Sequence, residues 1–508
     1  MCLLPSLPLW LTIGSSFWGG GGGVSGLTTA TALSKLAPAH VTPKIDICEI
    51  RPHPGTVGGA INLTPNALRL LDYLGVYQKI RDRRYGITVN AVEVFSIHHR
   101  NKLAESSFRG PNDEGIGSPP YKAIRITRAN LMHALIATLS TYPAIILHLD
   151  HRCLSIEQSP LSDGITATFS NSSTYTGSLP LGCDGVHSFT RNSHVDPDRK
   201  QLYTGVSNAF GFLPLTDEDR TAAHFEVSAL NFAPKGLLLT SYHEETRSEG
   251  YVGAIITMED VGSRDGWKAK GEDAQGVKQD MLERFAGMNT RLPIVSDWLS
   301  RVEGWFMWPV YMVENGGAGR WSRGRAMLLG DAAHAMPPQG ESTGIVIEHG
   351  VLFARCLWAK LAGRDTGVSW DPSKVTKAFE AYETLRRPRI EAACKESMAV
   401  FHSVKEMGRF GFWLKTCIIP IFLHLTRGKR QKHFEEDVTR SYLGFDGVHA
   451  EPEHAHSTVL LYSSGPWWTQ DSWNPADVAK LWQAWAATTL SRLWYRIWRS
   501  RSWTTKAE

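Results

Sequence analysis

Residues 19–36 read GGGGGVSGLTTATALSKL, and this stretch decides the fold class of the chain. Gly21, Gly23 and Gly26 satisfy the pattern G-x-G-x-x-G, and residues 27–36 have the small and apolar periodicity of a helix. Glycines at this spacing permit a tight turn, let the backbone approach a pyrophosphate and bring a helix close to a strand. The amides that begin the helix then face the phosphates. A run of five glycines also meets this pattern by chance, so a second observation is needed.

The second observation is an acidic residue at the end of the next predicted strand. Residues 44–49 read KIDICE and alternate as a strand does, and Glu49 lies 23 positions after Gly26. A carboxylate about 20 residues beyond the last glycine is where such folds hold ribose hydroxyls. The alternative is a surface Glu at a strand end. Together the two segments predict a dinucleotide-binding unit.

The segment before the glycines departs from the usual pattern. A strand is expected to lead directly into the first glycine, yet residues 14–20 separate the apolar stretch 7–13 from Gly21. Two explanations stay open: a local insertion, or a natural N-terminus that differs from this one.

Composition excludes several classes of protein. The 508 residues suffice for two or three domains. A net charge of +4 without a concentrated basic face argues against a nucleic-acid partner. The seven Cys are scattered and include no CxxC pair, which indicates reduced intracellular thiols and no metal site. No charge-free apolar run reaches the ~18 residues of a membrane-spanning helix. We therefore expect a cytoplasmic enzyme.

Three more segments follow in order along the chain. They are residues 58–66 (GGAINLTPN), residues 182–188 (GCDGVHS) and residues 330–344 (GDAAHAMPPQGESTG). With the glycine loop and Glu49, this set resembles the FAD-dependent aromatic hydroxylases. These are single-component flavoprotein monooxygenases such as salicylate and p-hydroxybenzoate hydroxylases, and they include fungal enzymes of secondary metabolism. The resemblance covers about residues 20–400.

The resemblance implies an α/β fold. We expect a Rossmann-like FAD-binding domain with an inserted β-sheet substrate domain, as in p-hydroxybenzoate hydroxylase, followed by a helical C-terminal region. The first part of the FAD-binding domain is predicted at 1–200 and its second part at 311–400. The substrate domain is predicted at 201–310, and the Trp-rich helical region at 401–508. The aromatic run at 305–308 either lines a pocket or packs in the core.

The resemblance also implies a set of site residues. Asp331 is expected to accept a hydrogen bond from a ribityl hydroxyl of the flavin. Arg128 begins a predicted helix, where a guanidinium is unfavourable unless an anion lies near. Arg191 is the catalytic candidate, near substrate or reductant, and its alternative is an ion-pairing surface Arg. The expected cofactor-binding residues are Gly21, Gly23, Gly26, Glu49, Gly59, Ala60, Arg128, Asp184, Asp331 and Gly344.

Two positions depart from the family pattern. The family reads GGQGAN where residues 340–345 read GESTGI, so Glu341 adds a carboxylate. That acid either raises the cost of forming an anionic reduced flavin or points to solvent. His349 replaces an acidic residue, and we expect it on the helix surface without a function.

The chemistry implied by the resemblance is oxygen transfer. NADPH or NADH reduces FAD, dioxygen adds to give a flavin hydroperoxide, and one oxygen passes to an electron-rich carbon. The expected substrate is an aromatic or polyketide-like secondary metabolite. One alternative is epoxidation of a terpenoid or indole alkene by the same chemistry. Another is a non-catalytic relic with a membrane-binding tail.

The C-terminal region has a different composition. Residues 410–425 are apolar but interrupted by Lys415 and Pro420, and the basic stretch 427–432 follows. Eight of the 18 Trp lie between 467 and 503, and apolar residues recur at near-helical spacing from 478. This region either packs on the catalytic body or lies on a membrane surface.

Overall fold

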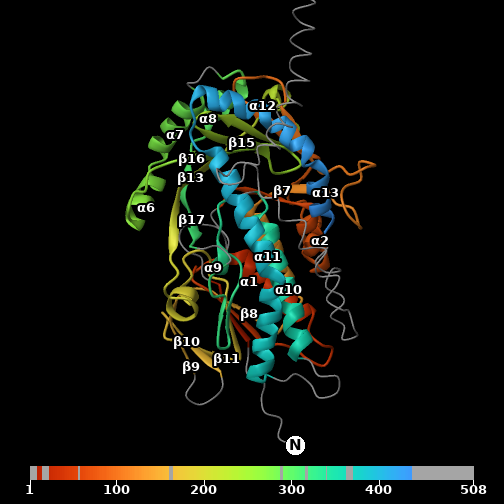
Figure 1. Ribbon diagram of the computed structural model, residues 1–508, viewed down its shortest axis with the longest axis vertical. Coiled ribbons are helices and arrows are strands. Elements are labelled where there is room, and N and C mark those ends of the chain that lie inside the picture. Colours follow the sequence, from red (N-terminus) through yellow and green to blue (C-terminus); the bar gives the residue numbers. More distant parts are fainter. Residues whose placement is uncertain are drawn as a thin grey trace, which may run out of the picture. The chain divides into compact units, whose positions relative to one another are not determined.

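The computed structural model describes residues 9–13, 22–54, 58–158, 164–286, 290–314, 318–338, 340–361 and 370–436 (Figure 1). The described residues belong to one compact unit, and residues 437–508 lie outside the described ranges. Gly21 and the Trp-rich stretch 467–503 also fall outside them. Their predicted roles therefore stay predictions.

A six-stranded sheet has the order β18-β19-β12-β1-β2-β8. All neighbouring pairs are parallel except β18 with β19. The central strand β1 is the apolar stretch predicted ahead of the glycines, and residues 14–21 separate it from the following helix. The strands are β1 (Leu9–Ile13), β2 (Ile45–Glu49), β8 (Ile145–His148), β12 (Leu179–Gly182), β18 (Ser322–Arg323) and β19 (Ala326–Leu328).

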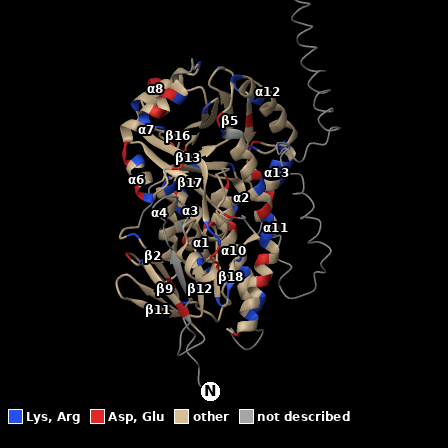
Figure 2. Ribbon diagram, turned by 60° about the vertical axis from the view of Figure 1, so that its left-hand side comes forward, with Lys and Arg blue, Asp and Glu red and all other residues tan. Residues whose placement is uncertain are grey.

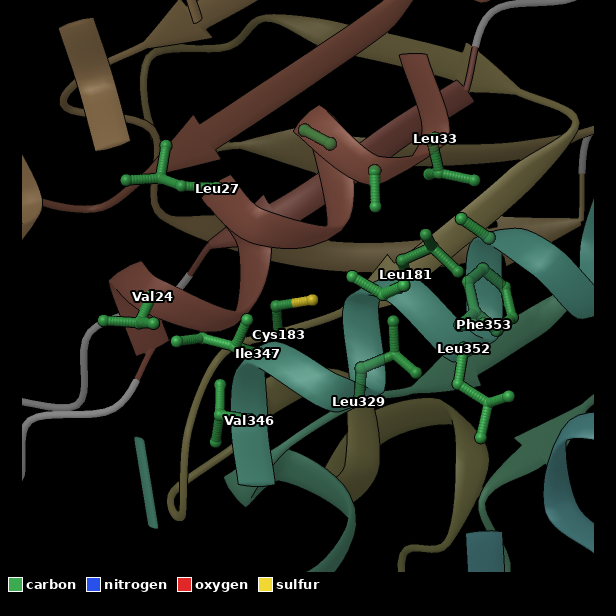
Figure 3. Close-up of a cluster of buried hydrophobic side chains, with 14 of the residues drawn as sticks. Val24, Leu27, Leu33, Leu181, Cys183, Leu329, Val346, Ile347, Leu352 and Phe353 are labelled. Carbon is green, nitrogen blue, oxygen red and sulfur yellow. The ribbon is translucent and has the colours of Figure 1, made fainter. Parts of the chain in front are cut away.

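Helices α1 (Gly22–Lys35) and α10 (Ser342–Leu361) pack closely together beside this sheet. A Cβ atom on Gly350 would lie 2.9 Å from the backbone nitrogen of Thr29, so a side chain there would push the helices apart. Figure 3 shows the apolar side chains that fill the space between these helices and the strand ends. They include Val24, Leu27, Leu181, Leu329, Val346 and Ile347.

A seven-stranded sheet has the order β17-β13-β16-β15-β14-β5-β6. One of its faces packs on helices α7 (Ala274–Met281) and α8 (Pro293–Arg301), through residues such as Ala209, Val252 and Leu238. The strands are β5 (Ala91–Ser96), β6 (Ala104–Ser107), β13 (Gln201–Pro214), β14 (Ser228–Ala233), β15 (Gly236–Tyr242), β16 (Glu249–Thr257) and β17 (Phe306–Val313). The sheet thus also takes in two strands that precede residue 201. The predicted domain boundaries stay predictions.

The described residues also form two three-stranded sheets. The order β3-β7-β4 comprises β3 (Ala60–Leu63), β7 (Ala123–Thr127) and β4 (Ile87–Val89), and the order β11-β10-β9 comprises β9 (Cys153–Gln158), β10 (Ile165–Phe169) and β11 (Thr174–Gly177). The first of these reaches the seven-stranded sheet, because Ala60 clusters with Phe210 and Tyr251. In the chain, α2 (Pro65–Tyr73) and α3 (Val76–Asp82) lie between β3 and β4, and α4 (Arg128–Leu139) follows β7.

The C-terminal helices lie along the body of the molecule (Figure 1). Helix α11 (Pro372–Val404) packs on α10, α12 (Arg409–Leu425) on β6, and α13 (Arg427–Glu435) on α2. Pro420 lies within α12 and does not end it. In the described part of the chain, no helix has the length and apolarity to cross a membrane. The shorter helices are α5 (Asp217–Ala222), α6 (Arg264–Glu272), α9 (Asp331–His334), η1 (Arg191–Val195) and η2 (Leu282–Ala286).

Candidate functional site

Three predicted carboxylates follow the carboxyl ends of parallel strands in the six-stranded sheet. Glu49 ends β2, Asp184 follows β12 by two residues, and Asp331 follows β19 by three. The glycine-rich start of α1 comes after β1 in the same way. Because parallel strands present these ends at one edge, the predicted residues converge where open α/β sheets bind ligands.

Gly330 brings the turn before Asp331 against the first turn of α1. Its φ of +62° lies in the left-handed region, which favours glycine. A Cβ atom at Gly330 would lie 2.9 Å from the Oγ atom of Ser25. This close approach places Asp331, the first residue of α9, beside the glycine pattern that contains Gly23 and Gly26.

Glu49 is held by its own strand end. Its Oε1 atom accepts a hydrogen bond from the backbone nitrogen of Arg51 at 3.0 Å, and its backbone carbonyl accepts one from the backbone nitrogen of His151 at 2.8 Å. The side chain is largely buried. This geometry fixes the carboxylate at the sheet edge, and its contact with a ribose stays a prediction.

Arg128 and Asp331 interact electrostatically within the predicted site. Thr127 caps α4 by accepting a hydrogen bond from the nitrogen of Asn130, so Arg128 begins the helix as predicted. Burial lowers the pKa of Arg128 and raises the pKa of Asp331, and the attraction between the two opposes both shifts. A half-buried cation beside a half-buried carboxylate fits a ligand that carries both phosphates and hydroxyls.

Backbone segment 58–60 passes between Arg128 and the seven-stranded sheet. A Cβ atom on Gly58 would lie 2.8 Å from Cδ of Arg128, and one on Gly59 would lie 2.5 Å from the hydroxyl oxygen of Tyr251. The nitrogen of Arg128 donates to the carbonyl of Gly59 at 3.1 Å. The predicted cofactor residues Gly59 and Ala60 therefore lie where the two sheets meet.

Asp184 organises the turn that follows β12. Its carboxylate accepts hydrogen bonds from the Ser188 hydroxyl, from the Thr190 nitrogen at 2.8 Å and from the Thr190 hydroxyl at 3.0 Å. These contacts occupy both carboxylate oxygens within the turn itself. Direct contact between Asp184 and a cofactor stays a prediction.

Arg191 is fully buried and links this turn to α9. Its Nη1 atom donates to the carbonyl of Ala332 at 2.9 Å, and its Nη2 atom donates to that of Val186 at 2.6 Å. Burial lowers its pKa to about 10. Through the carbonyl of Ala332, Arg191 thus holds the residue that follows Asp331. Contact between Arg191 and substrate or reductant stays a prediction.

Gly344 lies in the first turn of α10, where that helix meets α2. A Cβ atom there would lie 3.3 Å from Cβ of Ala67, so the small residue permits the close approach. The backbone amides of the first turn of α10 lack acceptors within the helix, and they can stabilise a negative charge.

Glu341, immediately before α10, contacts the C-terminal helix α13. Its Oε2 atom lies 2.6 Å from Nε2 of His433, whose Nδ1 atom lies 3.7 Å from Oε2 of Glu436. Arg389 pairs with the same Glu436 oxygen at 2.8 Å. The carboxylate of Glu341 thus contacts α13 and does not simply point to solvent. Its effect on the cost of forming an anionic reduced flavin stays a prediction.

The expectation that His349 lies on the helix surface is wrong. Its ring is fully buried, stacks on His334 with centroids 4.4 Å apart and hydrogen-bonds to the Tyr382 hydroxyl. Burial lowers the pKa of His349 well below its ordinary value, so the ring is neutral at neutral pH. The replacement of an acid at this position is thus accommodated by packing in the core.

Next to His349, a buried acidic residue joins α10 to α11. Glu348 lies 2.7 Å from Nη1 of Arg386, and both side chains are 1% exposed. Its other oxygen lies 2.8 Å from Nη2 of Arg389. Figure 2 shows acidic and basic residues interspersed along α11. Sequence reasoning missed these arginines, although the run RRPR at 386–389 was a signal for them.

The second face of the seven-stranded sheet is aromatic. Alternation along β13 places Phe210 and Phe212 on this face, and the register sets Tyr251 opposite Phe212. Phe210 stacks near Phe306 with centroids 5.2 Å apart and meets the edge of Trp308 at 5.1 Å. Part of the aromatic run 305–308 thus belongs to this face, whereas Trp305 packs in the core on the other side.

Comparison with known proteins agrees with this architecture. Residues 21–397 match the FAD binding domain family. The chain belongs to that family. It is an FAD-dependent monooxygenase, and FAD is its cofactor.

Individual relatives and one solved structure define the similarity further. A 3-amino-4-hydroxybenzoate 2-monooxygenase of Streptomyces platensis is 28% identical over 74% of this chain and 85% of its own length. A salicylate hydroxylase of Pseudomonas putida is 26% identical over 74% and 82%. The structure of Klebsiella pneumoniae HpxO with FAD and uric acid has a TM-score of 0.59 at 18% identity, and covers 90% of this chain and 97% of that one.

We expect the contact between Glu341 and His433 to hold α13 in place. Replacing His433 by Ala removes it and should weaken local anchoring of α13 by about 1 kcal/mol, which corresponds to roughly fivefold faster tryptic cleavage within residues 427–435. Gln431 donates a hydrogen bond to Glu435 on the same helix and supplies the control Q431A, which should cleave at the wild-type rate. Equal rates for H433A and wild type would contradict the anchoring role.

Proposed function

We propose that the protein hydroxylates a small aromatic metabolite, with NAD(P)H as reductant and dioxygen as oxidant. The observation that carries this proposal is the aromatic face of the seven-stranded sheet, which meets the predicted cofactor segment 58–60. The named relatives also act on aromatic rings, which supports the same substrate class. We expect a role in secondary metabolism.

The reaction balances with one molecule of each reactant. One oxygen atom of dioxygen replaces a ring hydrogen as a hydroxyl group, and the other leaves as water. Two electrons and a proton come from NAD(P)H, and one more proton comes from solvent. Bound FAD supplies the chemistry that activates dioxygen, and the protein supplies binding, orientation and a dry site.

Two groups of residues are suited to these tasks: one to hold the cofactor and one to hold the substrate. Arg128 and Asp331, together with the amides of α1 and α10, are suited to hold the cofactor. Phe210, Phe212 and Tyr251 offer ring faces and edges to an aromatic substrate and exclude water from it. The two groups meet at Gly59, so a ring held on the sheet lies close to the cofactor segment.

The test is the visible spectrum of the purified full-length protein before and after anaerobic addition of NADPH or NADH. We expect flavin bands that bleach on addition of one or both reductants. A phenol and polyketide screen with oxygen would then give hydroxylated products. Protein that retains no flavin would support a non-catalytic relic, and an epoxide product would replace hydroxylation by alkene epoxidation.

Membrane-surface association remains a separate prediction for the C-terminal region. The described part of that region packs on the body, yet α12 exposes the apolar side chains of Phe410, Trp413, Leu414 and Leu425. If these side chains bind lipid, the protein should cosediment with vesicles of phosphatidylserine and phosphatidylcholine, and F410S/W413S should not. Recovery of wild-type protein in the supernatant would contradict membrane binding.

A further inference from the structure

Arg125 is a buried cation beside the aromatic face. Its side chain is 3% exposed, its Nε atom donates to the Ser241 hydroxyl at 3.1 Å, and its Nη1 atom donates to Oδ1 of Asn62 at 3.2 Å. Its guanidinium carbon lies 5.0 Å from the ring centroid of Tyr251. The Nη2 atom is buried and has no hydrogen-bond partner.

No acidic residue in the described ranges forms an ion pair with Arg125. Its polar partners are a hydroxyl and an amide, both neutral. Burial lowers its pKa to about 10, and its interaction with Tyr251 opposes that shift. A buried charge without an opposite charge is costly, and folded proteins rarely keep one without a purpose. The site therefore favours an anion that comes from outside the chain.

A neutral acceptor lies near this cation. His243 follows β15, is 4% exposed, and places its Nε2 atom 3.0 Å from Oε2 of Glu249. Burial lowers its pKa to about 4, and Arg125 contributes to that shift. A neutral ring that donates from Nε2 to Glu249 has a lone pair on Nδ1, and that buried atom has no partner.

The register of the strands places both groups on the aromatic face. Ser241, which binds Arg125, pairs with Tyr251 across β15 and β16. The ring of His243 meets the edge of Phe212 with centroids 5.3 Å apart. Asn62 pairs with Arg125 and lies two residues beyond Ala60 on the strand that carries the cofactor segment. The unpartnered cation thus lies between that strand and the predicted substrate surface.

We propose that Arg125 binds the acidic group of the substrate, which is an aromatic carboxylate, and that His243 accepts a hydrogen bond from a hydroxyl group on the same ring. This inference rests on the proposed function and names its substrate class. A guanidinium suits a carboxylate because it donates through a planar fork. Phe212 and Tyr251 flank the two polar groups and contact the ring.

The test measures binding to the FAD-loaded full-length enzyme by perturbation of the flavin spectrum. The probes are benzoate, salicylate and 3-hydroxybenzoate, each paired with its neutral amide. Wild type should bind at least one acid about 10-fold or more tightly than its amide. R125M should lower the affinity for that acid by about 10- to 100-fold and change the affinity for the amide by less than threefold. R125K, which keeps the charge, should restore part of the loss.

Other outcomes separate the alternatives. Removing an uncompensated buried charge should leave the melting temperature unchanged or raised, so a marked loss of stability in R125M would make Arg125 structural and overturn the proposal. A loss of FAD affinity in R125M would make it a cofactor contact. Failure of every acid to outbind its amide would also overturn it. None of these measurements requires turnover. Failure of the carboxylate-binding proposal is therefore distinct from failure of the hydroxylase proposal.

His243 has its own variant. H243F keeps an aromatic ring but removes the acceptor, so it should bind benzoate as wild type does. It should also lose about fivefold in affinity for the hydroxybenzoate that wild type prefers. Equal losses for benzoate and the hydroxybenzoates would show that His243 acts only through packing, and would overturn its assigned contact.

Discussion

Replacing Glu348 by Gln is expected to lower the free energy of unfolding by about 3–5 kcal/mol. The substitution keeps the size of the side chain but removes the negative charge that faces Arg386 at 2.7 Å. Both side chains are buried, and the remaining partners of the guanidinium are neutral: the ring of His349 and the carbonyl of Ile345. The loss comes from a buried cation left without its counter-charge. Urea unfolding of the FAD-bound protein measures it.

A matched control separates this effect from the general effect of removing an acid. Glu272 makes an exposed pair with Lys268 at 3.9 Å, and E272Q should change the free energy by less than about 0.5 kcal/mol. Removing both charges with E348Q/R386M should recover much of the loss, because no buried charge then lacks its partner. A loss below about 1 kcal/mol for E348Q would show that solvent compensates the charge of Arg386.

The sequence predicted the cofactor side of the fold because its signals are local. The glycines of α1, the acid that ends β2 and the turn at Gly330 each belong to a strand–turn–helix segment of a few residues. Turn chemistry and strand alternation within such a segment determine its structure. Parallel pairing then places the segments at one edge of the sheet. The residue-specific cofactor contacts remain predictions.

The substrate side could not be predicted in the same way. Arg125 alternates with the buried Ile124 and Ile126 on β7, which is typical of a residue on the solvent-facing side of an antiparallel sheet. It is buried only because β15 and β16, more than 100 residues later, cover it. The parallel pairing of β14 with β5 is equally distant in sequence. No local pattern encodes such contacts.

The same reason explains the wrong expectation for His349. The family pattern showed that His349 replaces an acid, but it did not show which face of α10 is covered. Helix α11 covers this face through Tyr382. Glu341 acquires its partner from α13, 92 residues later. A substitution that looks unfavourable within its own motif can thus be balanced by a distant helix.

The pH dependence of FAD binding is expected to depend on Asp331. Burial raises the pKa of its carboxyl in the protein without bound FAD, and Arg128 opposes that shift. A ribityl hydroxyl that donates to the carboxylate favours the ionised form, so binding lowers this pKa. Binding therefore releases a proton between the two pKa values. FAD affinity should be full above the raised pKa and decrease as the pH falls through it, by up to tenfold per pH unit.

D331N separates this charge from the shape of the site. Asn carries no titrating proton, so the affinity of D331N should be independent of pH in that window. At high pH it should be about 10- to 100-fold weaker than wild type, because a hydrogen bond to a charged group is lost. D265N, an exposed acid on α6, should keep the wild-type profile. A wild-type profile in D331N would mean that Asp331 does not contact the cofactor, and that its burial serves Arg128 alone.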